Sequence, residues 1–241
     1  MMRLKWLFLV CLLGAAQAFA QSSPALFFSD LIFGPNTGWN NGTSQGAAVT
    51  IWGKNFGSTR GSSYVTINGA QATNYAEWDA IGPARGLERI TFWIPTNAAT
   101  GAGTISVTVN GVTSNTLPFT VDNTTVIYYI DGTNGNNSNN GRTTSTPFKS
   151  LYMFNPCCDP YHSGGQANPS GDGQYIAYVR GGNYSQLDTI AGDSTYITLR
   201  GPWGGPTKQK AIIGYPGETP VLNMQVATGG GFRTADWAPW T

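Results

Sequence analysis

Tyr175-Ile-Ala-Tyr-Val-Arg180, Tyr196-Ile-Thr-Leu-Arg200, Ala211-Ile-Ile213 and Val221-Leu222 are the four short β-prone runs that decide the fold. Glycine, proline and small polar residues separate them, as turns require. From Tyr175 to Tyr196 the offset is about 21 residues, within the range of solenoid repeats that each supply a strand and a turn. Residues 175–224 are therefore predicted to stack short strands in a solenoid.

The composition favours an extracellular all-β protein. Charged residues make up only 10% of the chain, against about 25% in typical globular proteins. The 32 glycines and 14 prolines predict frequent turns and few long helices. Aromatic residues make up 12% and provide apolar surface to bury, which argues against disorder.

The charge balance argues against nucleic-acid binding, and the hydropathy argues against a transmembrane segment in the mature chain. With 13 basic and 12 acidic residues the net charge is +1, and no basic patch suits nucleic-acid binding. After residue 20, no segment approaches the roughly 20 apolar residues of a transmembrane segment. His162 is the only histidine, so neither a His-rich metal site nor a His-centred triad is expected within this chain.

Residues 1–20 follow the plan of a secretory signal peptide. Arg3 and Lys5 give a positive start, an apolar run follows, and Ala18-Phe-Ala20 is a small-x-small cleavage site. Cleavage near Ala20 predicts a secreted or cell-surface protein, and attachment to the cell surface remains an open expectation.

Two adjacent cysteines, Cys157 and Cys158, remain after such a cleavage. In an oxidising compartment they are disulfide candidates. They could form a strained bridge with each other, pair with cysteines beyond this chain, or stay free.

Residues 24–121 alternate apolar and polar positions in short segments bounded by turn residues. This alternation is typical of antiparallel sheets with one face on the core. The dipeptides Asn68-Gly69 and Asn110-Gly111 fit type I′ hairpin turns. The pattern predicts a seven-stranded immunoglobulin-like sandwich of about 100 residues. The clearest segments are Ala48-Val-Thr-Ile-Trp52, Tyr64-Val-Thr-Ile67, Ile90-Thr-Phe-Trp-Ile94 and Thr104-Ile-Ser-Val-Thr-Val109.

The same residues, 24–121, resemble an IPT/TIG domain. The motifs that carry the resemblance are, in order, Gly53-Lys-Asn-Phe-Gly57, Val65-Thr-Ile-Asn-Gly69, Ile90-Thr-Phe-Trp-Ile-Pro95, Val107-Thr-Val-Asn-Gly111 with Ser114-Asn115, and Phe119-Thr-Val121. The resemblance implies an immunoglobulin-like spacer or binding module of bacterial surface and secreted proteins. It implies no catalytic residues.

Residues 126–154 lead into the solenoid. Val126-Ile-Tyr-Tyr-Ile130 is predicted to be a strand, and residues 131–141 are almost entirely turn-forming. Thr146-Pro-Phe-Lys-Ser-Leu151, followed by Phe154, places a proline before spaced apolar residues. This pattern predicts a short amphipathic helix that caps the open end of the stacked sheet.

Residues 126–224 resemble the opening rungs of a pectate-lyase-like right-handed parallel β-helix. The motifs are Tyr128-Tyr-Ile-Asp-Gly132, Thr146-Pro-Phe-Lys-Ser-Leu151, Gly173-Gln-Tyr-Ile-Ala-Tyr-Val-Arg-Gly-Gly182 with Tyr184, and Ala211-Ile-Ile-Gly-Tyr-Pro-Gly-Glu-Thr-Pro-Val-Leu222. Such strands are expected to bury one face and expose the other as a groove. Residues 227–241 offer no capping helix or closing strand, so residues 126–241 are expected to be the N-terminal portion of an incomplete β-helix.

The second resemblance implies glycan chemistry. Many enzymes of this fold are polysaccharide lyases that act by β-elimination on uronate-containing glycans. The reaction uses a Lys or Arg base and a cation such as Ca²⁺ on the substrate carboxylate. Such sites lie on middle rungs. Catalytic residues are therefore expected beyond this chain, and Ca²⁺ is an expectation for the full-length protein only.

Two arginines and three tryptophans are the candidate glycan-binding residues within the chain. Arg180 and Arg200 end successive strands at matching places and could line one edge of the groove, although solvated arginines there need no function. Trp203, Trp237 and Trp240 lie in loop-like segments, where their rings could stack on sugars or cover rung corners.

Other polar residues receive structural roles. Lys149 is assigned to the polar face of the predicted helix, and Lys208 and Lys210 to an exposed turn. Asp131 begins an Asn-rich loop that lacks the pattern of an EF-hand. A turn role is therefore favoured over calcium binding.

Two functional hypotheses follow. The first is a secreted fragment of a polysaccharide lyase, and the second is a non-catalytic surface or adhesin-like glycan-binding protein. Both take a polysaccharide as partner. Further rungs with Asp/Glu clusters and an isolated Lys or Arg on one groove face would favour the lyase.

Overall fold

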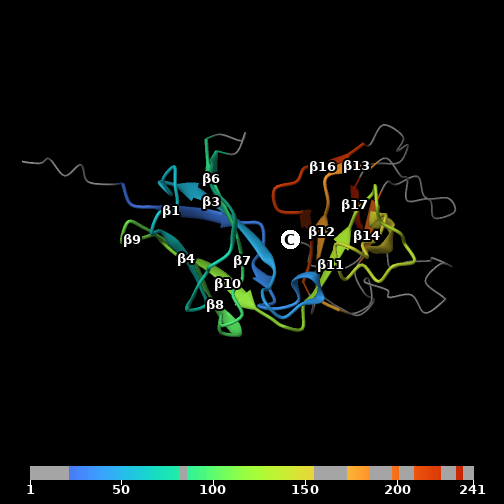
Figure 1. Cartoon of the computed structure of the whole chain (residues 1–241), viewed down its shortest axis with the longest axis horizontal. Helices are drawn as coiled ribbons and strands as arrows, with labels where there is room; N and C mark the ends of the chain where they lie inside the picture. The colour runs from blue at the N-terminus through green and yellow to red at the C-terminus, as the bar shows by residue number, and fades with distance from the viewer. Residues whose placement is uncertain are drawn as a thin grey trace, which may run out of the picture.

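The computed structural model describes residues 22–81, 86–154, 173–184, 197–200, 209–223 and 232–235, with the backbone alone for 79–81, 152, 197–200 and 232–235. Strands β1 to β10 form a sandwich, and strands β11 to β17, here called the parallel part, follow it (Figure 1). The described residues are all-β apart from short 3-10 helices, which confirms the predicted all-β class. The predicted signal peptide lies outside them.

Two sheets form the sandwich. The first has the order β1-β3-β7-β6, and all its neighbours are antiparallel. Its strands are β1 (Ala25–Ser29), β3 (Ala48–Lys54), β7 (Glu88–Trp93) and β6 (Tyr75–Ile81). The second has the order β2-β10-β8-β4-β5, with β9 also beside β8 and with β2 parallel to β10. Its strands are β2 (Phe33–Gly34), β10 (Leu117–Val121), β8 (Gly101–Val109), β4 (Tyr64–Ile67), β5 (Ala70–Gln71) and β9 (Val112–Thr113).

Two hairpins of the second sheet close as predicted. Asn68 and Gly69 join β4 to β5 with φ of 42° and 81°, and Asn110 and Gly111 join β8 to β9 with φ of 48° and 85°. A type I′ turn needs positive φ at both central positions, which Asn and Gly adopt at low cost. Apart from the two-residue strands β2, β5 and β9, the sandwich has the seven strands expected.

In the residues that the structure describes, the parallel part forms three small sheets. The largest has the order β11-β12-β15, and the other two pair β13 with β16 and β14 with β17, all in parallel. The strands are β11 (Val126–Ile130), β12 (Tyr175–Val179), β13 (Gly182–Tyr184), β14 (Ile197–Arg200), β15 (Lys210–Gly214), β16 (Pro220–Leu222) and β17 (Phe232–Ala235). Each of β12, β13 and β14 therefore pairs with the strand three elements later.

The register corrects the predicted repeat. Tyr175 lies opposite Lys210, 35 positions later, and Gly182 lies opposite Pro220, 38 positions later. The run after Tyr196 forms β14 in a different sheet from β12, so the predicted spacing of about 21 residues is wrong. The error arose because one repeat contains three strands, and neighbouring runs in the sequence are not neighbours in a sheet.

The predicted helix at 146–151 is also corrected. Phe148 instead forms a parallel bridge with Ile130 of β11. Its N–H donates to Tyr129 O at 2.9 Å, and its carbonyl accepts from Asp131 N at 2.8 Å. A single 3-10 turn, η2 (Leu151–Phe154), follows. The apolar spacing misled the prediction because the residues are indeed buried, but from an extended segment and one turn.

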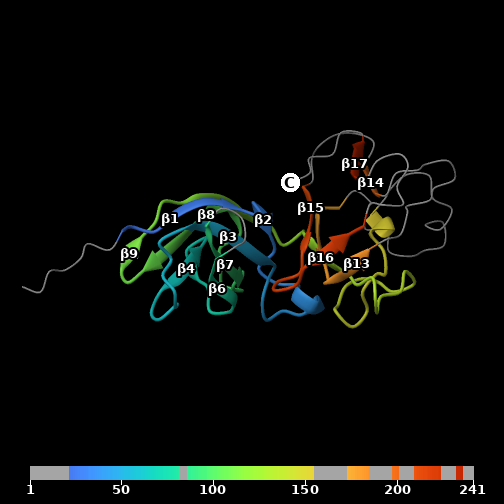
Figure 2. The same cartoon turned by 90° about the horizontal axis from the view of Figure 1, so that it is seen from above.

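One apolar core runs from the sandwich into the parallel part. The cluster that contains Ile51, Phe92 and the other sandwich core residues continues through Ile176 and Tyr178 of β12. The 3-10 helix η1 (Trp39–Asn41) lies at the boundary, where it is the short blue helix in Figure 2. The sandwich and the parallel part therefore share one apolar core.

Candidate functional site

The outer face of the first sandwich sheet supplies one wall of the candidate site. On this face Thr50 lies opposite Thr91, and Trp52 lies opposite Arg89. Glu77 of β6 pairs in the same sheet with Thr91. Successive strand residues point to opposite faces, so these polar and aromatic side chains lie outside the core that Ile51 and Ile90 fill.

The turn between β15 and β16 supplies the opposite wall. Both walls together enclose a cleft of about 410 Å³ between the sandwich and the parallel part. The residues that line it are Asp30, Thr50, Trp52, Glu77, Arg89, Thr91, Ile213, Gly214, Tyr215, Pro216, Gly217, Glu218 and Thr219. The cleft is therefore polar at its walls, with Trp52 and Tyr215 as its aromatic side chains.

An arginine–glutamate pair holds the sandwich wall. Arg89 Nε donates to Glu77 Oε2 at 2.6 Å, and Arg89 Nη2 donates to Glu77 Oε1 at 2.7 Å. This fork-to-fork geometry fixes both side chains across neighbouring strands. The pair offers a sugar further donors and acceptors without net charge.

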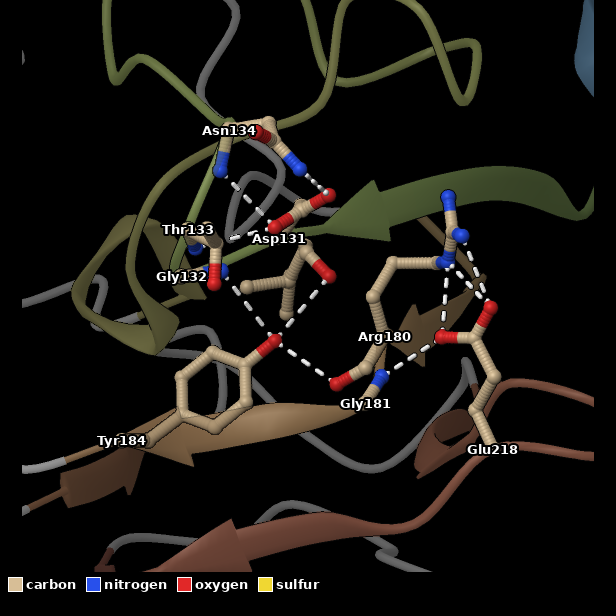
Figure 3. Close-up of polar contacts among 9 residues, drawn as sticks. Asp131, Gly132, Thr133, Asn134, Arg180, Gly181, Tyr184 and Glu218 are labelled. Atoms are coloured by element: carbon tan, nitrogen blue, oxygen red, sulfur yellow. Dashed lines mark hydrogen bonds and ion pairs between the residues drawn. The ribbon is translucent and has the colours of Figure 1, made fainter.

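A second pair holds the opposite wall (Figure 3). Arg180 Nε contacts both Glu218 oxygens at 2.8 and 2.9 Å, and its Nη2 lies 2.7 Å from Oε1. Gly181 N donates to Glu218 at 2.6 Å, and the Arg180 guanidinium lies 4.6 Å from the ring centroid of Tyr215. The hydrogen bond from Arg180 lowers the pKa of Glu218, and the same bond raises the pKa of Arg180. The ion pair between Arg180 and Glu218 therefore holds the β15–β16 turn in place.

Asp30 is the remaining charged residue of the lining. Thr50 N donates to its Oδ1 at 2.8 Å. Burial raises the pKa of the Asp30 carboxyl to about 7, although the hydrogen bonds from Thr50 oppose the shift. This carboxyl therefore changes charge near neutral pH.

Two rings form an aromatic platform beside the cleft. Phe28 of β1 stacks on Trp52 with ring centroids 5.0 Å apart and 19° between the planes. Phe28 is 48% exposed, and Trp52 is half-buried and also lines the cleft. Flat exposed rings of this kind suit the apolar faces of sugars.

Asp131 has the predicted turn role. Its carboxylate accepts hydrogen bonds from the N–H groups of Thr133 and Asn134, each at 2.9 Å (Figure 3). Burial would raise its pKa, but the hydrogen bonds from Asn134 and Thr133 lower it overall. Tyr184 closes the same corner by donating to Arg180 O at 2.9 Å. Among the described residues, no group of three potential metal ligands occurs.

The structure places few of the other predicted site residues. Trp203, Trp237, Trp240, Cys157 and Cys158 lie outside the described residues. Their predicted roles stay predictions.

The arginines do not occupy matching places. Arg180 follows β12 and Arg200 ends β14, which belong to different sheets, so their alignment along one edge is wrong. The guanidinium of Arg180 is held by Glu218, and for Arg200 only the backbone is described.

Neither Lys149 nor Lys210 lies in the element predicted for it. Lys149 is exposed, but it lies in an irregular segment before η2 and not on a helix. Lys210 was assigned to an exposed turn, but it begins β15 and is fully buried, with Nζ 5.5 Å from the ring centroid of Tyr175. The register opposite Tyr175 forces this position inward, where the long aliphatic stem packs. Lys208 lies outside the described residues.

Sequence reasoning missed the cleft itself. Trp52 and Thr50 were recognisable as the polar-face positions of an alternating strand, which was the available signal. Nothing in the sequence indicated that the turn carrying Glu218 lies against that face.

One comparison with known proteins gives a match. Residues 33–121 match the family model of the IPT/TIG domain. The match covers most of the sandwich and confirms the resemblance there. Searches among curated proteins and among solved structures gave no match to the chain. Within the described residues, no helix has the length and apolar character to cross a membrane.

Proposed function

We propose that the protein is a secreted carbohydrate-active protein that binds a glycan in the cleft between the IPT/TIG sandwich and the parallel part. Residues 1–20 act as its signal peptide, and the mature chain works outside the cell, free or attached to a surface. The observation that carries the proposal is the aromatic platform of Phe28 and Trp52, which runs into a cleft walled by paired ions.

The site has the composition of a sugar-binding surface. Sugars present apolar ring faces and many hydroxyl groups, so they need flat rings together with fixed donors and acceptors. Trp52 and Tyr215 supply the rings, and the Arg89–Glu77 pair supplies fixed polar groups. Because the ions are already paired, a neutral hydroxyl can bond to them without leaving a buried charge uncompensated.

The parallel part supports a second candidate function. We propose that residues 126–241 form the first coils of a right-handed parallel β-helix. Three parallel sheets with offsets of 35 and 38 residues support this proposal. Polysaccharide cleavage by β-elimination is the function that this fold would favour, and incubation with uronate polymers with and without Ca²⁺ tests it through the ultraviolet absorbance of unsaturated ends.

Binding is tested with the whole chain on immobilised or soluble polysaccharides. We expect Trp52→Ala and Phe28→Ala each to weaken binding about tenfold, because a stacked ring contributes roughly 1 to 1.5 kcal/mol. Tyr64→Ala is the matched control, since Tyr64 is a partly exposed aromatic residue of β4 in the other sheet.

The outcomes separate clearly. Loss of binding in Trp52→Ala with retention in Tyr64→Ala supports the site. Equal binding by wild type and Trp52→Ala would place any glycan site elsewhere and end the proposal for this cleft. Circular dichroism checks that Trp52→Ala and Tyr64→Ala are folded.

A further inference from the structure

The charged side chains that line the cleft restrict the charge of the ligand it can bind. Resting on the proposed glycan binding, we infer that the cleft accepts uncharged glycan units and rejects uronates. This inference reverses the substrate class that the β-helix resemblance implied, and it concerns the described cleft alone.

Two guanidinium groups in or beside the cleft, those of Arg89 and Arg180, are each paired with a glutamate. Arg89 directs Nε and Nη2 at the two oxygens of Glu77, and Arg180 directs Nε and Nη2 at Glu218. The N–H groups that remain on each guanidinium can still donate hydrogen bonds, but the positive charge of each is already balanced by a protein carboxylate. A uronate carboxylate in the cleft would therefore gain no uncompensated positive charge in return for its own desolvation.

The charge that remains is negative. Among the described residues that line the cleft, the charged side chains are Asp30, Glu77, Arg89 and Glu218. With Glu77 paired to Arg89 and Glu218 paired to Arg180, the remaining charge is that of Asp30. An anionic sugar therefore meets either a neutral or a negatively charged wall.

The surroundings of Asp30 make this repulsion depend on pH. Thr50 on β3 donates to its carboxylate, and Tyr178 on β12 interacts with it electrostatically. The other titratable or charged groups that line the same cleft are Glu77 on β6, Arg89 on β7, and Tyr215 and Glu218 on the β15–β16 turn. The pKa of Asp30 is raised to about 7, so its carboxyl is neutral in mild acid and charged in mild alkali. Uronate rejection should therefore strengthen as the pH rises through 7.

The test uses matched ligand pairs, because the sugar is unidentified. Oligomers of galacturonate, glucuronate and mannuronate are compared with their carboxyl-reduced forms, which keep the linkage and lose only the charge. Binding to the whole mature chain is measured by titration calorimetry at pH 5.5 and pH 8.5. Uronates stay ionised at both values, since ordinary carboxyl groups titrate near pH 4.

We expect one reduced oligomer to bind in a Trp52-dependent manner and its uronate form to bind at least tenfold more weakly at pH 8.5. The ratio of the two affinities should become several-fold smaller at pH 5.5. Asp30→Asn should keep the preference for the reduced form but lose its pH dependence. If that variant does not fold, the wild-type comparison at the two pH values still decides.

Each remaining outcome counts against the inference. A uronate that binds as tightly as its reduced form at pH 8.5, in a Trp52-dependent manner, overturns the inference and leaves the proposed glycan site intact. If the affinity ratio of the reduced and uronate forms is the same at pH 5.5 and pH 8.5, Asp30 does not repel the uronate. Absence of Trp52-dependent binding by every oligomer removes the proposed function and the inference with it.

Discussion

The two faces of the β11-β12-β15 sheet differ in what covers them. On one face Ile127, Ile176 and Tyr178 join the sandwich core, whereas on the other Tyr128 and Tyr175 pack in a second cluster with η2. All five residues of β12 are buried. A strand buried on both faces reads as a continuous apolar run, which is the pattern of Tyr175-Ile-Ala-Tyr-Val179.

The groove expected along these strands is absent from the part of the chain that the structure describes. One face of these strands was predicted to be exposed, but the sandwich covers it, so a groove along β12 does not exist. A cleft with polar lining residues lies instead at the corner after the strands, where the β15–β16 turn meets the outer face of the first sandwich sheet. The IPT/TIG sandwich therefore does more than hold the parallel part at a distance: it forms half of the cleft.

The largest expected effect comes from removing Trp39, whose ring joins the sandwich to the face of the β11-β12-β15 sheet that packs on it. Trp39 lies 4.9 to 5.6 Å from the rings of Tyr178, Tyr129, Tyr215 and Trp93. Trp39→Ala should lower the free energy of unfolding by about 3 to 5 kcal/mol. It should also split one thermal transition into two, because the sandwich and the parallel part lose their shared core.

Differential scanning calorimetry of the whole chain measures this effect. Trp52→Ala serves as its control, since Trp52 lies on the same sandwich but is half-buried at the cleft. A single cooperative transition in Trp39→Ala would show that coupling does not depend on the aromatic contact.

How far the sequence predicts this architecture depends on the range of the interactions. The Asn-Gly turns and the alternating strands were predictable because both depend on residues a few positions apart. The partner of Tyr175 was not, because Lys210 lies 35 positions away behind two other strands. The cleft was harder still to predict, since Asp30 and Glu218 line one cleft only when the two parts dock.

The second prediction compares two tyrosines on the face that meets the sandwich. Tyr178 donates to Ala48 O at 2.7 Å in the buried core, whereas Tyr129 accepts from Asn40 N at 2.8 Å. Tyr178→Phe should cost about 1 to 2 kcal/mol, because the buried carbonyl of Ala48 loses its partner. Tyr129→Phe should cost less, since Asn40 is exposed and water can replace the hydroxyl.

Urea unfolding of both variants measures the difference. An equal cost for the two substitutions would mean that burial of the partner does not determine the contribution of the hydroxyl.

The third prediction concerns the ion pair at the corner beyond the sheet. Arg180 lowers the pKa of Glu218 below its ordinary value of 4.5. The pair therefore stabilises the fold above about pH 4.5, and this contribution is lost as the pH falls through the lower folded pKa. Since both side chains are more than a quarter exposed, we expect Glu218→Gln to cost only about 1 kcal/mol at pH 7.

Unfolding of wild type and Glu218→Gln at pH 7, 5 and 3 measures this contribution. The difference should be full at pH 7 and 5 and shrink at pH 3. A difference that persists unchanged at pH 3 would assign the effect to packing rather than charge.

The last prediction concerns Asp30, on the sandwich side of the cleft. Its folded pKa of about 7 lies above the ordinary value of 3.8, so between these values the unfolded chain is ionised while the folded chain stays protonated. The wild type therefore loses stability as the pH rises from about 4 to 7. Asp30→Asn keeps an oxygen for Thr50 N and has no charge to bury, so at pH 8 it should be more stable than wild type, by as much as about 4 kcal/mol, because each unit of pKa shift corresponds to about 1.4 kcal/mol. At pH 4 the two proteins should unfold alike. If Asp30→Asn is the less stable protein at pH 8, the charge of Asp30 stabilises the folded state and the predicted cost of burying it is wrong.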